Sequence, residues 1–441
     1  MSFWTVERVA AALGQGPSDG RPLGGITTDT RALAPGSCFV ALRGERFDAH
    51  DYLAQAVTAG AAALVVEDAT RTAGLGVPVF TVEDTHLALA DLARYRRLAW
   101  ARPVVAVGGS NGKTSTKELL KAVLGSRLRV HATTGNLNNR VGVPLTLLAL
   151  DDAADVAVIE VGTNQPGEIA FLRDVVRPDL AVVTTVQEEH LEGFGDLAGV
   201  MAEELALCDE VPIAVVPAAE PEVVAEATRR AGRVVAVTVP TTSGVHADGL
   251  GWIDLEGTRV ELPLRGRHNV ANAALALAVG REFGIAIADA ARGIAAMPLP
   301  SMRSAVTPLG RALLLNDAYN ANPGSAKAAL ALLTDIGAGR QRVVVLGTMR
   351  ELGAAAARAH REVAEVALAG GFDLICGIGE FVPALEQLAL GDPRILLAND
   401  VEDLWPQLQP RLAPDAAILL KASRGVALER LVPPLTTWAT A

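Results

Sequence analysis

Short apolar runs alternate with segments of helical periodicity along most of the chain. Runs rich in Val, Ile, Leu and Ala stand at 38–42, 62–66, 104–107, 155–162, 180–186, 313–317, 342–346, 374–379 and 417–420. Runs of this length bounded by polar turns are typical of buried strands. Between 212 and 264 the strands are weaker, and we expect this part to form the edge of a sheet. Strands that alternate with helices predict an α/β fold with parallel sheets and right-handed crossovers.

The length of 441 residues is enough for about three domains of ordinary size. We expect a small α/β domain at residues 1–100, a central parallel-sheet domain at 101–300 and a Rossmann-like domain at 301–441.

A glycine-rich turn separates the run at 104–107 from a segment of helical periodicity. The turn and the start of the helix are Gly109, Ser110, Asn111, Gly112, Lys113, Thr114 and Ser115. In such a loop the backbone N–H groups and the positive helix end face an anion, the lysine reaches the outer phosphates, and the threonine hydroxyl can ligate Mg²⁺. Val107 stands where the longer G-x-x-x-x-G-K-[ST] pattern has its first glycine, so a chance glycine-rich turn is the alternative. The flanking strand and helix favour a site for ATP or GTP.

Two ionisable side chains stand where predicted strands of the central domain end. Glu160 lies at the tip of the run at 155–162, where an unpaired carboxylate is costly to bury, so a metal partner such as Mg²⁺ is favoured. His190 follows the run at 180–186. It is either structural or a ligand of a metal ion or a phosphate.

Other polar clusters leave two interpretations open. The clusters at 28–31 and 48–51 follow strands, where ligands collect in open α/β sheets, but they could equally be caps and turns. The amide-rich loop at 133–144 could present donors to phosphates or a peptide, or could be a solvated turn. Asn269 and Asn272, one helical turn apart, could read a base or cap a helix.

Composition narrows the class of protein. A formal charge of −11 argues against general nucleic-acid binding. The 3 cysteines are far apart and fit neither a disulfide framework nor a metal-ligand spacing. The N-terminus lacks the basic start and apolar core of a signal peptide, and no apolar run reaches the roughly 20 residues that span a membrane. We therefore expect a soluble cytoplasmic protein, and a monomer because no coiled-coil repeat is visible.

These motifs resemble those of the Mur ligases, ATP-dependent amide-bond ligases of peptidoglycan precursor synthesis. Residues 109–115 match the family loop G-[ST]-x-G-K-T-[ST]. The Tyr-Asn-Ala-Asn-Pro loop at 319–323 is the most discriminating, because sister ligases and folylpolyglutamate synthases usually carry a histidine in it. The similarity runs essentially end to end and keeps the motif order.

The resemblance implies a reaction. ATP phosphorylates the terminal carboxylate of a UDP-N-acetylmuramoyl-tripeptide, and the amine of D-alanyl-D-alanine attacks the acyl phosphate. The first domain is then expected to bind the UDP substrate, the central domain ATP and Mg²⁺, and the third domain the dipeptide.

The resemblance also implies roles for individual residues. The implied catalytic residues are Lys113, Glu160, His190 and Arg303. The implied ATP contacts are residues 109–115 of the glycine-rich loop together with Asn272, Arg303 and Asp317. The implied substrate contacts are Thr28, Asp29, Thr30, Arg31, Asn136, Asn138, Asn139, Tyr319, Asn320, Asn322, Lys421, Ser423 and Arg424. The implied Mg²⁺ ligands are Thr114, Glu160, His190 and Glu204.

One departure from the family pattern concerns a lysine. Family members usually carry a lysine after this histidine that CO₂ carbamylates to give a metal-binding carboxylate. The corresponding position falls on Glu203 or Glu204, and no lysine lies between Lys121 and Lys327. We expect Glu204, or else Glu203, to supply the carboxylate directly. A glutamate ends about 3–4 Å short of a carbamylated lysine, so a bridging water or a shifted helix must close the gap.

Two other interpretations remain at this stage. A sister ligase that adds a different amino acid is disfavoured by the loop at 319–323. A nucleotide-binding homologue that has lost catalysis would explain the missing lysine. Retention of Lys113, Thr114, Glu160 and His190 favours an active ligase. The sequence leaves the third residue of the tripeptide undetermined.

Overall fold

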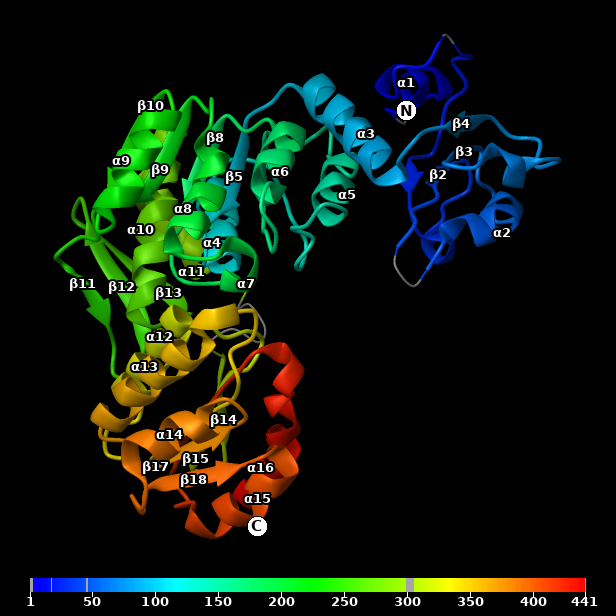
Figure 1. The fold of residues 1–441 in the computed structure, drawn as a ribbon. Helices are drawn as coiled ribbons and strands as arrows, with labels where there is room; N and C mark the ends of the chain where they lie inside the picture. The colour runs from blue at the N-terminus through cyan, green and yellow to red at the C-terminus, as the bar shows by residue number, and fades with distance from the viewer. Residues whose placement is uncertain (1–2, 17, 45–46, 299–304, 441) are drawn as a thin grey trace. The chain divides into compact units, whose positions relative to one another are not determined.

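The computed structural model describes residues 3–16, 18–44, 47–298 and 305–440 (Figure 1). The chain forms two compact units, each described by itself below. The first comprises Met1–Ala106, Arg129–Gly162 and Glu168–Leu180, and the second comprises Val107–Leu128, Thr163–Gly167 and Ala181–Ala441. The domain boundaries near residues 100 and 300 stay a prediction.

A four-stranded parallel sheet begins the first unit, in the order β1-β2-β3-β4. The strands are β1 (Ile26–Thr27), β2 (Cys38–Val40), β3 (Ala63–Val66) and β4 (Val79–Thr81). Helices α1 (Val6–Ala12) and α3 (Thr85–Trp100) cover one face, on which Cys38 and Val40 lie, and α2 (Leu53–Thr58) covers the other, on which Phe39 lies. Successive side chains of β2 therefore contribute to two hydrophobic cores, one on each face of the sheet.

A six-stranded sheet has the order β10-β9-β8-β5-β7-β6. Its strands are β5 (Val104–Gly108), β6 (Val130–Ala132), β7 (Val156–Glu160), β8 (Leu180–Val183), β9 (Ile213–Pro217) and β10 (Arg233–Val237). β5 and β7 are buried along their whole length, as the continuous apolar runs predict. In the second unit, α10 (Arg267–Glu282) and α11 (Ile287–Ala295) pack against α4 (Lys113–Gly125) (Figure 1). The remaining helices of this part of the chain are α5 (Gly142–Leu148), α6 (Glu168–Val176), α7 (Leu191–Phe194), α8 (Leu197–Leu205) and α9 (Pro221–Arg230).

The prediction for residues 212–264 was partly wrong. β10 is the edge strand of the six-stranded sheet, with β9 beside it. The rest forms a separate antiparallel sheet of β11 (Ser243–Val245), β12 (Leu250–Leu255) and β13 (Thr258–Arg265). β12 and β13 are joined by Glu256 and Gly257, both with positive φ (52° and 74°). Two such residues make the tight turn that suits an antiparallel hairpin.

The C-terminal sheet has the order β14-β15-β19-β16-β17-β18. Its strands are β14 (Ala305–Leu309), β15 (Ala312–Asp317), β16 (Arg342–Leu346), β17 (Leu374–Ile378), β18 (Ile395–Ala398) and β19 (Ala417–Lys421). β14 is antiparallel to β15, which corrects the expectation of parallel strands throughout, and the other pairs are parallel.

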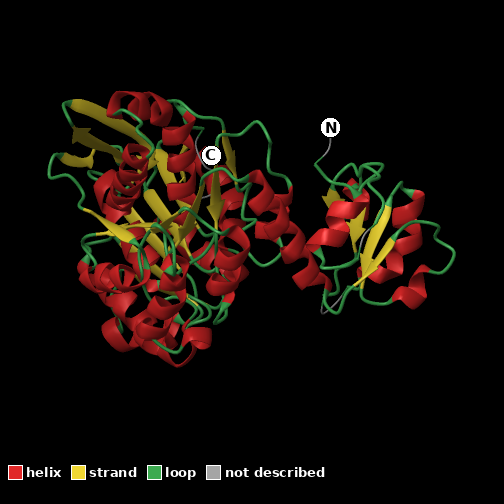
Figure 2. Ribbon diagram, turned by 90° about the horizontal axis from the view of Figure 1, so that it is seen from above, coloured by secondary structure: helices red, strands yellow, loops and turns green. Residues whose placement is uncertain are grey.

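Figure 2 shows the helices in red and the strands in yellow. The helices of the C-terminal part pack against its sheet or against one another. They are α12 (Pro323–Ile336), α13 (Ala356–Ala369), α14 (Phe381–Ala389), α15 (Val401–Leu408) and α16 (Val432–Thr440). Val343 and Val345 of β16 share one core with Leu404 of α15 and Leu435 of α16. In the described part of the chain, none of the helices has the length and apolar character that a membrane crossing requires. The three cysteines are buried and free.

Candidate active site

The glycine-rich loop runs from the end of β5 to the first residue of α4, as predicted. Gly109 and Gly112 have φ of 112° and 85°, in the region that favours glycine. A Cβ on Gly109 would lie 2.4 Å from Oγ1 of Thr184, and one on Gly112 would lie 2.6 Å from Oδ1 of Asn272. Thr184 and Asn272 therefore pack closely against the loop at its two glycines. The structure also brings Asn272, the residue expected to contact adenine, against the loop.

Lys113 lies folded back on its own loop. Its Nζ donates to the carbonyl oxygen of Gly109 at 2.6 Å and lies 3.9 Å from Oε1 of Glu189. Since Glu189 is 5% exposed, the lysine sits beside a buried carboxyl group. Sequence reasoning assigned no role to Glu189. Its place directly before His190 was the available signal.

The two adjacent glutamates of α8 have different partners. Glu204 is completely buried, and its Oε2 accepts a hydrogen bond from the Gly109 N–H at 2.6 Å. Glu203 accepts instead from Oγ1 of Thr163 at 3.0 Å and from the Gly167 N–H at 2.7 Å. Consecutive helical residues point about 100° apart, so only one of the pair can face the glycine-rich loop. That residue is Glu204.

Glu189 and Glu204 form a coupled carboxyl pair. Burial raises the pKa of Glu189 to about 8; the Lys113 charge lowers this pKa, whereas the Glu204 charge raises it. Burial also raises the pKa of Glu204, against the lowering effects of Lys113 and of the Gly109 N–H. The Oε1 atoms of both residues are buried and have no hydrogen-bond partner among the described residues. Such a pair retains a proton unless a cation compensates it.

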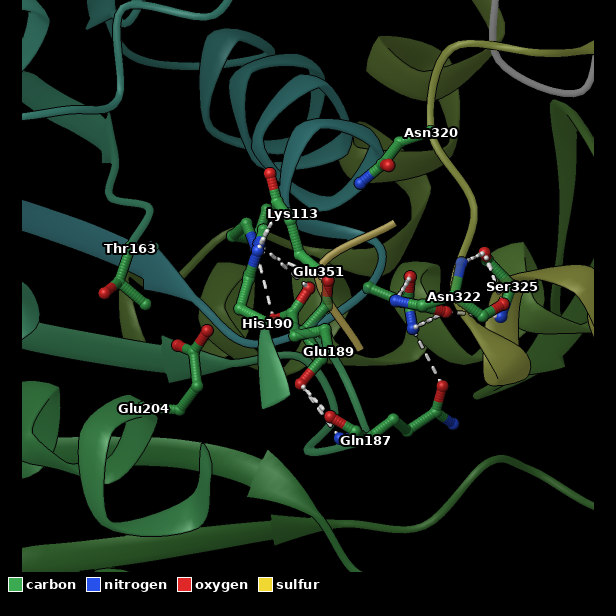
Figure 3. A network of polar contacts seen from close by, with 12 residues as sticks. Lys113, Thr163, Gln187, Glu189, His190, Glu204, Asn320, Asn322, Ser325 and Glu351 are labelled. Atoms are coloured by element: carbon green, nitrogen blue, oxygen red, sulfur yellow. Dashed lines mark hydrogen bonds and ion pairs between the residues drawn. The ribbon is translucent and has the colours of Figure 1, made fainter. Parts of the chain in front are cut away.

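His190 joins α7 to the loop that follows β16 (Figure 3). Its Nδ1 contacts Oε2 of Glu351, and its Nε2 lies 3.9 Å from Oε2 of Glu189. The Glu192 N–H donates to the Glu351 carbonyl at 3.1 Å. The sequence analysis assigned no role to Glu351. A carboxylate on one imidazole nitrogen fixes the tautomer and leaves the other available as a ligand.

Glu160 belongs to the first unit, where it ends β7 as predicted and is 1% exposed. Its Oε1 accepts from Nδ2 of Asn138 at 2.9 Å, and its backbone N–H donates to Oγ1 of Thr133 at 2.9 Å. Asn139 instead accepts from the Gly142 N–H at 2.8 Å, at the start of α5. The loop at 133–144 thus organises the carboxylate of Glu160, and its contact with a substrate stays a prediction, as does that of Asn136.

The cluster at 28–31 shows a local structural role. The Asp29 carboxylate accepts from the Arg31 backbone N–H at 2.9 Å and pairs with the Arg31 guanidinium at 2.8 Å. These contacts, the side-chain hydrogen bond first, lower the pKa of Asp29 to about 2. The capping interpretation is therefore confirmed for Asp29. Binding of the UDP substrate by Thr28, Thr30 and this pair stays a prediction.

The third-domain residues meet at the carboxyl ends of β15 and β19, which are neighbours. Nζ of Lys421 lies 2.5 Å from Oδ2 of Asp317 and donates to the Asn320 carbonyl at 2.8 Å. Because Lys421 is 3% exposed, its charge is compensated mainly by Asp317. The Arg424 guanidinium lies 5.7 Å from the centre of the Tyr319 ring.

Two other predicted residues lie differently. Ser423 accepts from the Arg350 N–H at 2.9 Å. Asn322 does not point at the cluster around Lys421; it reaches the glycine-rich loop, as described below. Arg303 lies outside the described residues, so its role stays a prediction. Within the described ranges no group of three or more His, Cys, Asp or Glu side chains is arranged to hold a metal ion.

The glycine-rich loop between β5 and α4 is a phosphate-binding loop (P-loop) in form, and it lies beside buried carboxyl groups. This arrangement is typical of a nucleotide-dependent enzyme. Family models match three successive parts of the chain: "Mur ligase family, catalytic domain" at residues 22–97, "Mur ligase middle domain" at 107–280 and "Mur ligase, glutamate ligase domain" at 302–424. The chain therefore belongs to the Mur ligase family, as its motifs predicted, and is an ATP-dependent ligase.

Individual relatives are similar over nearly their whole length. The UDP-N-acetylmuramoyl-tripeptide–D-alanyl-D-alanine ligase of Escherichia coli (strain K12) is 37% identical over 432 residues, which cover 94% of both chains. A crystal structure of MurF from Acinetobacter baumannii superposes with a TM-score of 0.89 and 28% identity, covering 98% of this chain and 99% of that one. MurF from Thermotoga maritima in complex with ADP gives a TM-score of 0.80 and 27% identity, covering 94% and 97%.

Proposed function

We propose that this protein joins D-alanyl-D-alanine to a UDP-N-acetylmuramoyl-tripeptide in the cytoplasm, with conversion of ATP to ADP and phosphate. The observation that carries the proposal is end-to-end similarity to ligases of that name, together with a P-loop that holds Lys113 beside buried carboxyl groups. The Tyr-Asn-Ala-Asn-Pro loop at 319–323 supports the dipeptide over a single amino acid as the incoming group.

The reaction has two steps in this proposal. A carboxylate oxygen of the tripeptide attacks the γ-phosphorus, the bond to the β-phosphate oxygen breaks, and ADP leaves. The dipeptide amine then attacks the acyl carbon, phosphate leaves, and the amine loses a proton. Phosphorylation makes the carboxyl oxygen a good leaving group, and the negative charge on the phosphates must be neutralised throughout.

Side chains and backbone groups around the glycine-rich loop are proposed to bind the nucleotide. Lys113 is proposed to exchange its contact with the Gly109 carbonyl for the outer phosphates of ATP. The N–H groups at the start of α4 face the same anion. Asn272 and Asp317 are proposed to contact adenine and ribose, and Arg303 the phosphates.

Mg²⁺ fits the residues present. The buried Oε1 atom of Glu204 has no hydrogen-bond partner among the described residues, and carboxylate and hydroxyl oxygens are the ligands that Mg²⁺ prefers. We propose Thr114, Glu160, His190 and Glu204 as the residues that hold it. Bound Mg²⁺ supplies positive charge to the phosphates.

The contacts of α8 support Glu204, and not Glu203, as the replacement for the family's carbamylated lysine. Glu204 faces the glycine-rich loop, whereas both carboxylate oxygens of Glu203 bind residues 163–167. The shorter reach of Glu204 is relevant here, because Glu189 places a second carboxyl group beside it.

The test is phosphate release from ATP by the purified protein with UDP-N-acetylmuramoyl-tripeptide, with and without D-alanyl-D-alanine. We expect release that needs both substrates, and a pentapeptide product of matching mass. Nucleotide binding without any release would instead support a homologue that has lost catalysis. Release with a single amino acid in place of the dipeptide would support a sister ligase.

A further inference from the structure

Two asparagine side chains from distant parts of the second unit form a reciprocal amide pair. Nδ2 of Asn111, in the glycine-rich loop, donates to Oδ1 of Asn322 at 3.1 Å. Nδ2 of Asn322, at the start of α12, donates to Oδ1 of Asn111 at 3.0 Å (Figure 3). They are 211 residues apart in sequence. Each amide donates through its nitrogen and accepts through its oxygen at once, which an ionised carboxylate cannot reproduce because it only accepts.

Surrounding contacts fix the orientation of both amides. The Ser325 N–H donates to Oδ1 of Asn322 at 2.8 Å, so that atom must be the oxygen and the amide nitrogen must face Asn111. Nδ2 of Asn111 donates a second bond, at 2.8 Å, to Oε1 of Gln187. Asn322 is 4% exposed, whereas Asn111 is half-buried, so these bonds are partly removed from water.

Gln187 ties the pair to the end of β8. Its backbone N–H donates to Oγ of Ser110 at 2.9 Å, and that hydroxyl donates to the Gln187 carbonyl at 3.0 Å. Gly324 leaves the room that this glutamine needs: a Cβ there would lie 1.8 Å from Oε1 of Gln187. The start of α12 is thus fitted closely to the nucleotide loop.

We propose that Asn111, Asn322 and Gln187 form an amide clasp that couples the nucleotide loop to the start of α12. Asn322 is therefore a positioning residue, not a direct contact of the dipeptide. Nucleotide in the loop fixes Asn111, Asn111 fixes Asn322, and Asn322 fixes the loop at 319–325. The consequence for the dipeptide rests on the proposed function, because there this loop receives the incoming amine.

Serine variants test the clasp. Asn322→Ser keeps a good N-cap for α12 but is too short to reach Asn111. Asn111→Ser keeps the backbone of the glycine-rich loop. The double variant completes a mutant cycle, and Asp400→Ser, at the N-cap of α15, is the matched control for a cap exchange.

The first readout is hydrogen exchange of the segment at 319–330 with and without ADP. This measurement needs no catalysis, so it tests the clasp even if the protein has no ligase activity. We expect ADP to slow exchange of this segment in the wild type and in the control. In both single variants and in the double variant, the slowing is expected to fall below about 2-fold. Undiminished slowing in the single variants overturns the proposal.

The second readout is steady-state kinetics. Each single variant is expected to raise the KM for D-alanyl-D-alanine about 5-fold, within the usual range of coupling between sites. The KM for the UDP-tripeptide should stay within about 2-fold. The KM for D-alanyl-D-alanine of the double variant should be no higher than that of either single variant, because either substitution alone already removes the Asn111–Asn322 contact. Effects that multiply would show that the two asparagines act independently, and would overturn the proposal.

Discussion

Replacement of Glu204 by glutamine should change how the stability of the protein depends on pH. The structure buries Glu204 completely and couples it to Glu189, and burial raises the pKa of both. A carboxyl group with a raised pKa in the folded state binds its proton more tightly there than in the unfolded chain. It therefore stabilises the fold below its unfolded pKa, and this contribution is lost as pH rises through the folded pKa.

The magnitude follows from the number of protons. For Glu189 the pKa moves from 4.5 to about 8, so the window is roughly pH 4.5 to 8. One proton held only by the folded state lowers the free energy of unfolding by about 1.4 kcal/mol per pH unit in that window. Glu204 adds to this slope in the wild type and cannot titrate in the variant. The glutamine amide can also donate to Glu189, which lowers the pKa of that group. We expect the slope to fall by up to about one proton, or 1.4 kcal/mol per pH unit.

The assay is urea unfolding of the wild type and Glu204→Gln at several values between pH 5 and 8.5, with a metal chelator present. Glu226→Gln is the matched control. Hydrogen bonds from Arg230 and then Arg229 lower the pKa of Glu226, so its titration lies outside the window. An unchanged slope in Glu204→Gln would refute the coupled carboxyl pair. The same change in the control would show that the effect is not specific to the site.

Three further perturbations test other parts of the site. Gly112→Ala should weaken ADP binding at least about 10-fold, because the added Cβ meets the buried side-chain amide of Asn272. Gly257→Ala, at a residue with positive φ but no neighbour within 4 Å, should leave ADP binding unchanged. Each variant should lose about 1–2 kcal/mol of unfolding free energy, and equal ADP binding by the two variants would contradict the steric argument. In a Mg²⁺ titration of phosphate release, Glu203→Gln should leave the half-saturating Mg²⁺ concentration within about 2-fold of the wild type. Glu204→Gln should raise that concentration about 10-fold or more, in the range seen for groups that support a metal site. The reverse order would identify Glu203 as the ligand. Lys421→Met should destabilise the fold by about 3–5 kcal/mol in urea unfolding, because the Asp317 carboxylate loses its buried partner; adding Asp317→Asn should restore most of the loss, and no restoration would contradict the ion-pair argument.

Local pattern in the sequence was enough for the parts of the site that lie within one strand–turn–helix unit. The loop at 109–115 follows from the strand before it and the helix after it. Glu160 was placed at a strand tip because its apolar run ends there, and the structure agrees. The sequence analysis assigned Asp317 to ATP and Lys421 to the substrate, and their ion pair follows from β15 and β19 being neighbours in the sheet, which the structure shows. The family was identified from motif order alone.

Contacts between elements far apart in the chain needed the tertiary structure. The sequence could not choose between Glu203 and Glu204, because the choice depends on how α8 is rotated against the glycine-rich loop. The same holds for Asn322: only the structure shows that its side chain meets Asn111, and its contact with a substrate stays a prediction. Periodicity in the sequence shows which face of a helix or strand is buried. Only the packing of the elements in the fold determines which side chains of other elements contact that face. The chain by itself therefore specified a P-loop ligase, and the fold decided which carboxyl and amide groups surround the nucleotide loop.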